Sequence, residues 1–296
     1  MKQRLEKIIG DVFGRVKLSS VQQVAGGDIH NSFLVNYYGH HDQKHSVFCK
    51  VNSLSLKDVL HSEFQSLGFF ATQRGLNYPE PIDFICDEKY AYLIMSAHLI
   101  VSLEPGNCYL AGAALAQQHK INNQKFGWHV DNFIGLSPQQ NNFCSDWPEF
   151  FTSRRISPQV KAAAANDINP ILLSKLRASH SYLELVLAER NIQPALLHGD
   201  LWSGNLGFDC QQNRAIFYDP APYFGDPEVD IAMTQLFASL DSRFYRSYYE
   251  QANFKPANEK IRATYNLYHA LNHFNLFGHN YQSLVEQQLN LTGFVS

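Results

Sequence analysis

The residues best suited to chemistry lie in one short segment that follows an apolar run ending at Leu197. His198, Gly199 and Asp200 come directly after this run, and four residues separate Asp200 from Asn205. Transfer of a phosphoryl group to a hydroxyl needs a carboxylate that takes the hydroxyl proton and a nearby oxygen ligand for a metal ion. This spacing offers both, so Asp200 is a candidate base and Asn205 a candidate metal ligand.

A second carboxylate is expected beside Asn205. Residues 215–218 form an apolar strand that ends at Asp219, and the polar residues 209–213 predict the turn of a hairpin. Pairing of the two strands would return Asp219 to Asn205, where a carboxylate and an amide oxygen side by side suit Mg²⁺. A single aspartate at a strand end is usually a turn or cap residue. The combination of the three elements favours a site.

Two features nearer the N-terminus fit nucleotide phosphates. Lys50 lies within an apolar strand, where an inward lysine needs a partner, and Glu63 follows thirteen residues later on a predicted helix. Taken alone, an edge-strand lysine and a surface glutamate explain these two residues. Gly26 and Gly27 stand between two predicted strands and suit a loop whose backbone approaches phosphates, although a plain hairpin turn has the same composition.

The elements that must position these residues change character along the chain. The first 95 residues are rich in predicted strands and contain one clear helix, whereas the remainder is mainly helical. Helices are expected over residues 109–120, 169–190, 227–240, 259–277 and 280–289. The pattern predicts an α+β fold of two lobes, a small β-rich lobe over residues 1–97 and a larger helical lobe over residues 98–296.

Composition limits the class of partner. The chain has 296 residues, of which 45% are hydrophobic and 17% charged, and its formal net charge is −3. This balance argues against a bulk electrostatic grip on nucleic acid or on a membrane surface. No apolar stretch approaches the ~20 residues of a membrane span, and the N-terminus does not resemble a signal peptide. The five scattered cysteines contain no CxxC pair, so we expect thiols in a reducing cytoplasm.

Taken together, the motifs resemble the fructosamine kinase (ketosamine-3-kinase) family, in the aminoglycoside and choline kinase-like branch of the protein-kinase-like fold. The resemblance runs from about residue 20 to residue 280 and includes HGDLW-x-GN, the following DPA, FGW-x-x-DN-x-IG and LNHFN-x-FG. The matching segments are Gly26–Asn31, Phe48–Lys50, Glu63, Phe126–Gly135, Asp146–Phe151, His198–Asn205, Asp219–Ala221, Gly225–Asp230 and Leu271–Gly278.

The resemblance implies a role for each matching residue. Asp200 would be the catalytic base, with ATP as phosphoryl donor and Mg²⁺ held by Asn205 and Asp219. Lys50, paired with Glu63, would hold the phosphates of ATP. The remaining implied residues are Gly26 and Gly27 for the phosphates, the backbone of Ser96, Ala97 and His98 for adenine, Trp202 and His273 for the sugar-amine, and Asp230 and His198 as structural supports.

Two further residues are candidates for the acceptor side. Trp128 suits stacking on a sugar or an amine, although core packing explains a tryptophan equally well. Asp131 is the one carboxylate expected there besides Asp200. Two departures from the family pattern also appear: Asp28 stands where many members have a cysteine of the glycine loop, and Ser96 stands where an acidic residue usually follows the methionine.

The same residues separate the chain from protein kinases. Gly199 stands where the HRD motif has its arginine, and only ten residues separate Asp219 from Asp230, which leaves no room for a peptide-docking activation segment. A small-molecule acceptor follows. The leading hypothesis is ATP-dependent phosphorylation of the 3-hydroxyl of a ketosamine, either ribulosamine or fructosamine, free or bound to protein.

Two alternatives remain, and several questions stay open. The chain could phosphorylate another amino-alcohol or an aminoglycoside, although such enzymes usually place more acidic residues around a polycationic acceptor. It could also be a pseudokinase that binds nucleotide without catalysis, but none of the expected Lys, Asp and Asn residues is missing. The preferred ketose and the oligomeric state do not follow from the sequence.

Overall fold

The structure is a computed structural model that describes residues 1–24, 29–252 and 255–295. Gly26 and Gly27, the predicted phosphate-loop glycines, lie outside the described residues, as does Asp28. The chain forms two compact units, one of Met1–Ser102 with Gly207–Tyr218 and the other of Leu103–Leu206 with Asp219–Ser296. Relative to the expected boundary after residue 97, the first unit runs to Ser102 and also takes in a hairpin from much later in the chain.

In its described residues, the first unit contains two helices, two short 3₁₀ turns and most of the strands. Its elements are α1 (Lys2–Phe13), β1 (Lys17–Val24), β2 (Asn31–Tyr38), η1 (His40–Asp42), β3 (Lys44–Ser53), η2 (Leu54–Leu56), α2 (Lys57–Thr72), β4 (Pro81–Cys86), β5 (Tyr90–Ser96), β6 (Ile100–Val101), β10 (Leu206–Asp209) and β11 (Arg214–Phe217). Helix α1 covers the N-terminal residues, whose charged sequence is typical of a helix, and α2 is the one clear helix that the sequence predicted among the strands.

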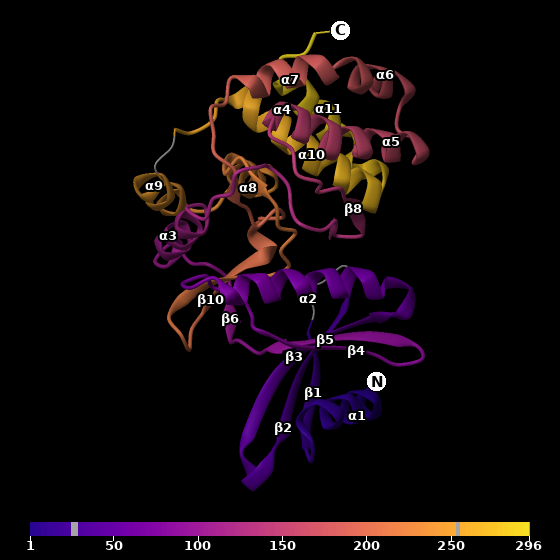
Figure 1. Ribbon diagram of the computed structural model, residues 1–296, viewed down its shortest axis with the longest axis vertical. Coiled ribbons are helices and arrows are strands. Elements are labelled where there is room, and N and C mark those ends of the chain that lie inside the picture. The colour runs from indigo at the N-terminus through magenta and orange to yellow at the C-terminus, as the bar shows by residue number, and fades with distance from the viewer. Residues whose placement is uncertain (25–28, 253–254, 296) are drawn as a thin grey trace. The chain divides into compact units, whose positions relative to one another are not determined.

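An antiparallel sheet with strand order β1-β2-β3-β5-β4 forms the centre of this unit. Successive side chains of a strand point to opposite faces, so Val47, Cys49 and Val51 of β3 share one face. They pack in a buried cluster with Leu5, Ile8 and Ile9 of α1. Lys50 therefore points to the other face, which α2 covers (Figure 1).

The late hairpin joins the first unit through strand pairing. Strands β10 and β11 pair as the sequence predicted, and β10 also pairs with β6 in the order β11-β10-β6. Phe208 lies opposite Val101 and Asp209 opposite Ile100. Because a two-residue strand such as β6 has no recognisable sequence pattern, the position of this hairpin was not expected.

The second unit is mainly helical. Its elements are α3 (Cys108–Gln118), β7 (Asn132–Ile134), β8 (Ser137–Gln139), α4 (Trp147–Phe151), the π-helix η3 (Thr152–Ile156), α5 (Ser157–Ala165), α6 (Pro170–Ala178), α7 (His180–Ala188), β9 (Ala195–Leu196), η4 (Ser203–Asn205), β12 (Phe224–Gly225), α8 (Glu228–Leu236), α9 (Ser242–Gln251), α10 (Glu259–Phe277), η5 (His279–Tyr281) and α11 (Gln282–Leu291).

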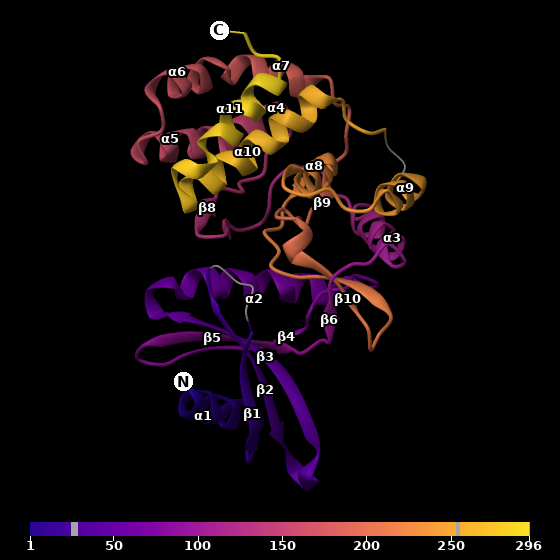
Figure 2. The ribbon, with the colours of Figure 1, turned by 180° about the vertical axis from the view of Figure 1, so that it is seen from behind.

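Helix α10 is the central helix of this unit. It begins at the Asn258 cap, ends before Gly278, and buries most of its residues. It packs against α11, α8 and α5, and Figure 2 shows α10 and α11 side by side. A helix surrounded by others in this way is expected to be apolar over most of its circumference.

The single helix expected over residues 169–190 is instead two helices, α6 and α7. Ser179 lies between them, and its side chain donates a hydrogen bond to the carbonyl of Leu176. Leu176, Leu183 and Leu187 are buried as the apolar spacing predicted, but Ile171 is 71% exposed. The apolar stripe therefore begins later than the sequence suggested.

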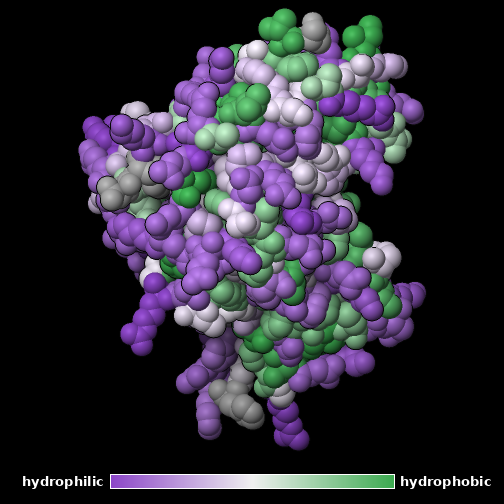
Figure 3. Space-filling view, turned by 45° about the horizontal axis from the view of Figure 1, so that its top comes forward, coloured by the Kyte–Doolittle hydropathy of each residue, from purple (hydrophilic) through white to green (hydrophobic). Residues whose placement is uncertain are grey.

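The surface of the described residues is mixed. Figure 3 shows hydrophilic residues over most of the face that it draws, with hydrophobic residues in patches between them. In the described ranges no helix combines the length and apolar character needed to cross a bilayer. All five cysteines are free thiols.

Candidate active site

The segment after β9 is held in place by a buried carboxylate. Asp230 of α8 accepts the backbone N–H of His198 at 2.7 Å and that of Gly199 at 2.9 Å. Gly199 has a φ of +84°, and a Cβ at this position would lie 2.0 Å from the carbonyl oxygen of Ala221. Only glycine can occupy this place, because both the left-handed backbone and the close approach exclude a side chain.

A hydrogen-bonded chain supports Asp230 in turn. His119 lies 3.1 Å from Asp230 through Nε2 and 2.7 Å from the hydroxyl of Tyr248 through Nδ1. Burial alone would raise the pKa of Asp230, but the hydrogen bond and charge of His119, the charge of His198 and the Gly199 N–H hold it below the ordinary value. The carboxylate therefore stays ionised, which keeps both backbone hydrogen bonds strong.

Asp200 is set up differently. Nδ2 of Asn205 donates to the Asp200 backbone carbonyl at 2.8 Å and to Asp200 Oδ2 at 3.2 Å. Burial, followed by the negative charge of Asp219, raises the pKa of Asp200 to about 7, against the lowering effect of the Asn205 hydrogen bond. A carboxyl group whose pKa lies near neutrality can both take and hold a proton, which is what a general base must do.

Asp219 comes back to this segment as the hairpin predicted. The N–H of Ala221 donates to the carbonyl of His198 at 2.8 Å, and the charge of Asp219 acts on Asp200. Asp219 has a φ of +57°, a backbone conformation that aspartate tolerates better than most residues.

The donor set here fits a hard cation. Because Nδ2 of Asn205 is turned to Asp200, its Oδ1 is the amide atom that can face a metal ion, and Asp219 adds carboxylate oxygens. Among the described residues, no three His, Cys, Asp or Glu side chains form a metal-binding group. Mg²⁺ is usually held by one or two carboxylates together with substrate phosphates and water, so this sparse set suits it.

In the first unit, Lys50 and Glu63 form the ion pair that the sequence predicted. Nζ of Lys50 lies 2.6 Å from Oε1 of Glu63, and the two side chains are 6% and 11% exposed. Glu63 shares a stripe of α2 with the buried Leu60 and Leu67, which explains how a glutamate comes to lie against the sheet. A buried lysine needs such a carboxylate partner, and the contact holds its ammonium group in one direction.

The segment that follows β5 contains a second buried pair. His98 Nδ1 lies 2.7 Å from Asp209 Oδ2, and His98 Nε2 lies 2.8 Å from the hydroxyl of Ser96, which in turn accepts the N–H of Glu80. These bonds fix the backbone from Ser96 through Ala97 to His98, the segment expected to contact adenine.

Trp202 and His273 are brought into one aromatic cluster by a residue that the sequence did not single out. Phe237, which caps the C-terminus of α8, has its ring 6.4 Å from that of Trp202 and 4.6 Å from that of His273. Phe277 and Tyr281 complete the group. The spacing of His273 and Phe277 on one helix face could have predicted part of this cluster; nothing in the local sequence pointed to Phe237.

The other two acceptor candidates lie outside this cluster. Trp128 is only 3% exposed and packs against Phe224. This is the core packing that was the alternative to stacking on a substrate. Asp131 accepts the backbone N–H of Asn141 through Oδ1, across the β7–β8 hairpin. Both side chains therefore have structural partners.

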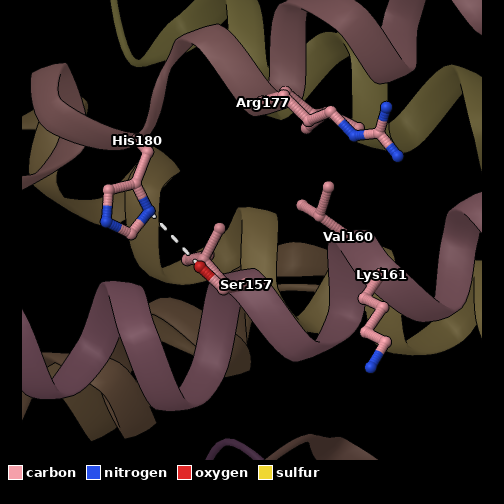
Figure 4. Close-up of a pocket in the computed structure, with 7 residues that line it drawn as sticks. Ser157, Val160, Lys161, Arg177 and His180 are labelled. Carbon is pink, nitrogen blue, oxygen red and sulfur yellow. Dashed lines mark hydrogen bonds between the residues drawn. The ribbon is translucent and has the colours of Figure 1, made fainter.

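Among the described residues, the second unit has surface pockets that do not include the catalytic segment, and two of them have the following linings. One, of about 260 Å³, lies between α5 and α6 and is lined by Ser157, Lys161, Arg177 and His180 among others (Figure 4). The other, of about 410 Å³, includes His119 and Pro227. Neither is lined by Asp200, Asn205, Trp202 or His273.

The chain is similar in sequence to several known proteins. A family model described as fructosamine kinase matches residues 1–292. A Synechocystis protein assigned as a probable ketoamine kinase is 32% identical over 292 residues, which cover 97% of this chain and 94% of that protein. The chloroplastic protein-ribulosamine 3-kinase of Arabidopsis thaliana is 38% identical over 180 residues, 60% of this chain and 55% of that protein.

Solved structures show the same fold. A protein of Haemophilus somnus assigned as a fructosamine-3-kinase superposes with a TM-score of 0.85 at 22% identity, over 99% of this chain and 97% of the other. The choline kinase LicA of Streptococcus pneumoniae superposes with a TM-score of 0.66 at 13% identity, over 99% of both chains. The expected protein-kinase-like fold with a strand-rich N-terminal part is confirmed.

Proposed function

Because the chain belongs to the fructosamine kinase family, we propose that it transfers the terminal phosphoryl group of ATP to the 3-hydroxyl of a ketosamine. The observation that carries this proposal is the placement of Asp200. Its carboxyl group is fixed by Asn205 on a segment that Asp230 braces, and its pKa is raised to about 7. Trp202, one member of the aromatic cluster, lies on the same segment.

In this mechanism, Asp200 accepts the proton of the acceptor hydroxyl as that oxygen attacks phosphorus. The hydrogen bond from Asn205 holds the Asp200 carboxylate in one orientation. Asn205 and Asp219 would hold Mg²⁺, which when bound neutralises charge on the phosphates. The buried Lys50 ammonium, oriented by Glu63, would bind the phosphates of ATP, and the backbone of Ser96–His98 would bind adenine.

The acceptor side favours a ketosamine over a polycationic aminoglycoside. Ammonium groups that lose their water need acidic partners, because an unpaired buried charge is costly. Asp131, the carboxylate expected there besides the base, already accepts a backbone N–H. A ketosamine carries one amine and a row of hydroxyls, which suits aromatic faces with a few hydrogen-bonding groups.

The chemistry of the product indicates what the reaction achieves. Phosphate is a better leaving group than hydroxide, so a ketosamine 3-phosphate is less stable than the ketosamine and releases its amine. We propose deglycation of amines or protein lysines as the role of the enzyme. The acceptor would be small or protein-bound, without nucleic acid.

The test is a coupled assay of ADP release with a panel of acceptors: ribulosamine, fructosamine, choline and kanamycin. We expect turnover with one or both ketosamines. The kcat/KM for choline and for kanamycin should be much lower than that for the ketosamines. A higher kcat/KM for kanamycin or choline would reject the proposal, and ATP binding without turnover on any acceptor would support the pseudokinase alternative.

A further inference from the structure

Trp202, Phe237, His273, Phe277 and Tyr281 form an aromatic cluster that reaches the catalytic segment through Trp202. The centroids of the rings that are in contact lie 4.6–6.5 Å apart, in tilted or edge-to-face arrangements. Phe237 and Phe277 are 40% and 42% exposed, so faces of these rings remain open to a ligand.

The cluster is attached directly to the catalytic segment. The backbone carbonyl of Trp202 accepts the N–H of Asn205 at 3.0 Å, and the indole lies so close to Gly204 that a Cβ there would approach the ring to 2.3 Å. The indole thus folds over the turn that carries Asn205. Because Trp202 stands only two residues after Asp200, an acceptor whose hydroxyl reaches this carboxylate is expected to extend toward the indole.

Electrostatics make the cluster attractive to a cation. Phe237 caps the C-terminus of α8 and Phe277 is the last residue of α10, and neither helix has a basic residue in its last turn. Helix C-termini carry partial negative charge, and aromatic faces are negative as well. In the described part of the chain, no lysine or arginine lies over any of these five rings.

His273 does not oppose a cation. Its Nδ1 lies 2.9 Å from the carbonyl of His269, so Nδ1 donates and Nε2 is left as an acceptor in the neutral ring. Burial lowers the pKa of His273 below the ordinary value, against the raising effect of that hydrogen bond. The neutral ring adds an acceptor for an N–H or O–H group and no positive charge.

We propose that the rings of this cluster, Phe237 first among them, bind the protonated amine of the acceptor by cation–π interaction. The inference rests on the proposed function and adds to it: the enzyme selects cationic secondary amines over neutral amides of the same sugar. Phe237 is the binding residue that joins Trp202 to His273. The partial negative charge of the helix C-termini attracts the amine, as carboxylates would attract a polycationic acceptor.

The experiment compares two acceptors that differ in charge at the amine: a 1-alkylamino-1-deoxyketose, protonated at neutral pH, and its neutral N-acetyl derivative. Cation–π contacts of about 0.5–2 kcal/mol correspond to about 2- to 30-fold in affinity. We expect Phe237→Leu, which keeps apolar volume, to raise KM for the cationic acceptor by this factor. The KM for the neutral acceptor and for ATP should change less than about twofold, the lower end of that range.

Two matched variants test whether the effect of Phe237→Leu comes from the loss of the aromatic face at this position. Phe237→Tyr keeps the aromatic face and should retain the wild-type preference for the cationic acceptor, whereas Phe143→Leu, at an exposed phenylalanine outside the cluster, should leave both KM values unchanged. Equal KM increases for both acceptors in Phe237→Leu, or no increase, would overturn the inference while leaving the proposed function intact. Failure of the wild type to phosphorylate either acceptor would overturn the proposed function itself.

Discussion

The catalytic segment and the aromatic cluster are neighbours that are stabilised in opposite ways. In the segment, the backbone of His198 and Gly199 and the side chain of Asp200 are each held by hydrogen bonds to named partners. In the cluster, five rings meet mainly by their faces and edges, and Phe237 and Phe277 are 40% and 42% exposed.

This difference predicts which kinetic parameter each kind of substitution should change. Hydrogen bonds fix one geometry and lose much when one partner is removed, whereas ring contacts are individually weak and tolerate adjustment. Changes in the catalytic segment should therefore affect kcat, and changes in the cluster should affect KM for the acceptor.

The largest effect is expected for Asp200→Asn. An amide cannot take the acceptor proton, and removal of a positioned general base typically costs about 10²–10⁴-fold in rate. Single-turnover phosphoryl transfer should fall by this factor, while the Kd for ATP, measured by calorimetry, should stay nearly unchanged. A variant that kept near-wild-type turnover would show that another group removes the proton.

Asp219→Ala should change a different set of parameters. Because Asp219 would hold the metal ion that neutralises charge on the phosphates, its loss should raise KM for Mg·ATP and lower kcat by about 10²-fold together. Titration with Mg²⁺ measures the effect directly, and a titration curve identical to that of the wild type would exclude Asp219 as a ligand. Asp131→Ala is the matched control, because that carboxylate binds a backbone N–H instead.

His269, one turn before His273 on α10, should make the free energy of unfolding depend on pH. Burial and the neighbouring His273 lower the pKa of His269 from 6.5 to about 3, and within the described residues neither ring nitrogen has a hydrogen-bond partner. The unfolded chain takes up the proton first as pH falls below 6.5, so stability is lost from there down to about pH 3. Between about pH 7.5 and pH 5 this group should account for ~2 kcal/mol of the loss.

The measurement is urea unfolding of the wild type and of His269→Phe at both pH values. The variant has no titrating ring, so its stability should fall by ~2 kcal/mol less than that of the wild type over this range. An equal fall in both proteins would mean that the imidazole is protonated in the folded state.

The smallest of these effects is expected for Trp202→Ala. Loss of one ring from the cluster should raise KM for the sugar-amine by about 10-fold, equivalent to ~1.4 kcal/mol, with kcat and KM for ATP changed much less. Steady-state kinetics with each substrate varied in turn separate the two KM values. A change confined to the KM for ATP would place the indole on the nucleotide side.

Local patterns predicted much of the fold. Alternation along β3 separated Lys50 from Val47, Cys49 and Val51, and the ion pair with Glu63 confirmed that separation. The polar turn at residues 209–213 predicted the β10–β11 hairpin, and α10 spans Glu259–Phe277, the range that its sequence pattern predicted. These elements were predictable because their side-chain periodicity is set by neighbours along the chain.

Other features depended on partners far away in the chain. The break between α6 and α7 at Ser179 and the exposure of Ile171 do not follow from apolar spacing, which continues through both helices. The same holds for Trp128, whose burial against Phe224 depends on a segment much later in the chain. A pattern gives the face that a residue occupies on its own element, and packing decides what that face meets.

Residue types and local spacing were enough to predict the chemistry that the chain can offer: Asp200 and Asn205 at a fixed spacing, Asp219 at a strand end, and a lysine on the inner face of a strand. Such features depend on residue type and on local backbone geometry, which neighbours along the chain set. The three-dimensional fold was needed to show that Asp230 accepts hydrogen bonds from the backbone N–H groups of the catalytic segment. It was also needed to show that Phe237 contacts both Trp202 and His273. The physical reason is that hydrogen bonds and ring contacts act over a few ångströms in space, whereas the residues that make them lie more than thirty positions apart in the chain.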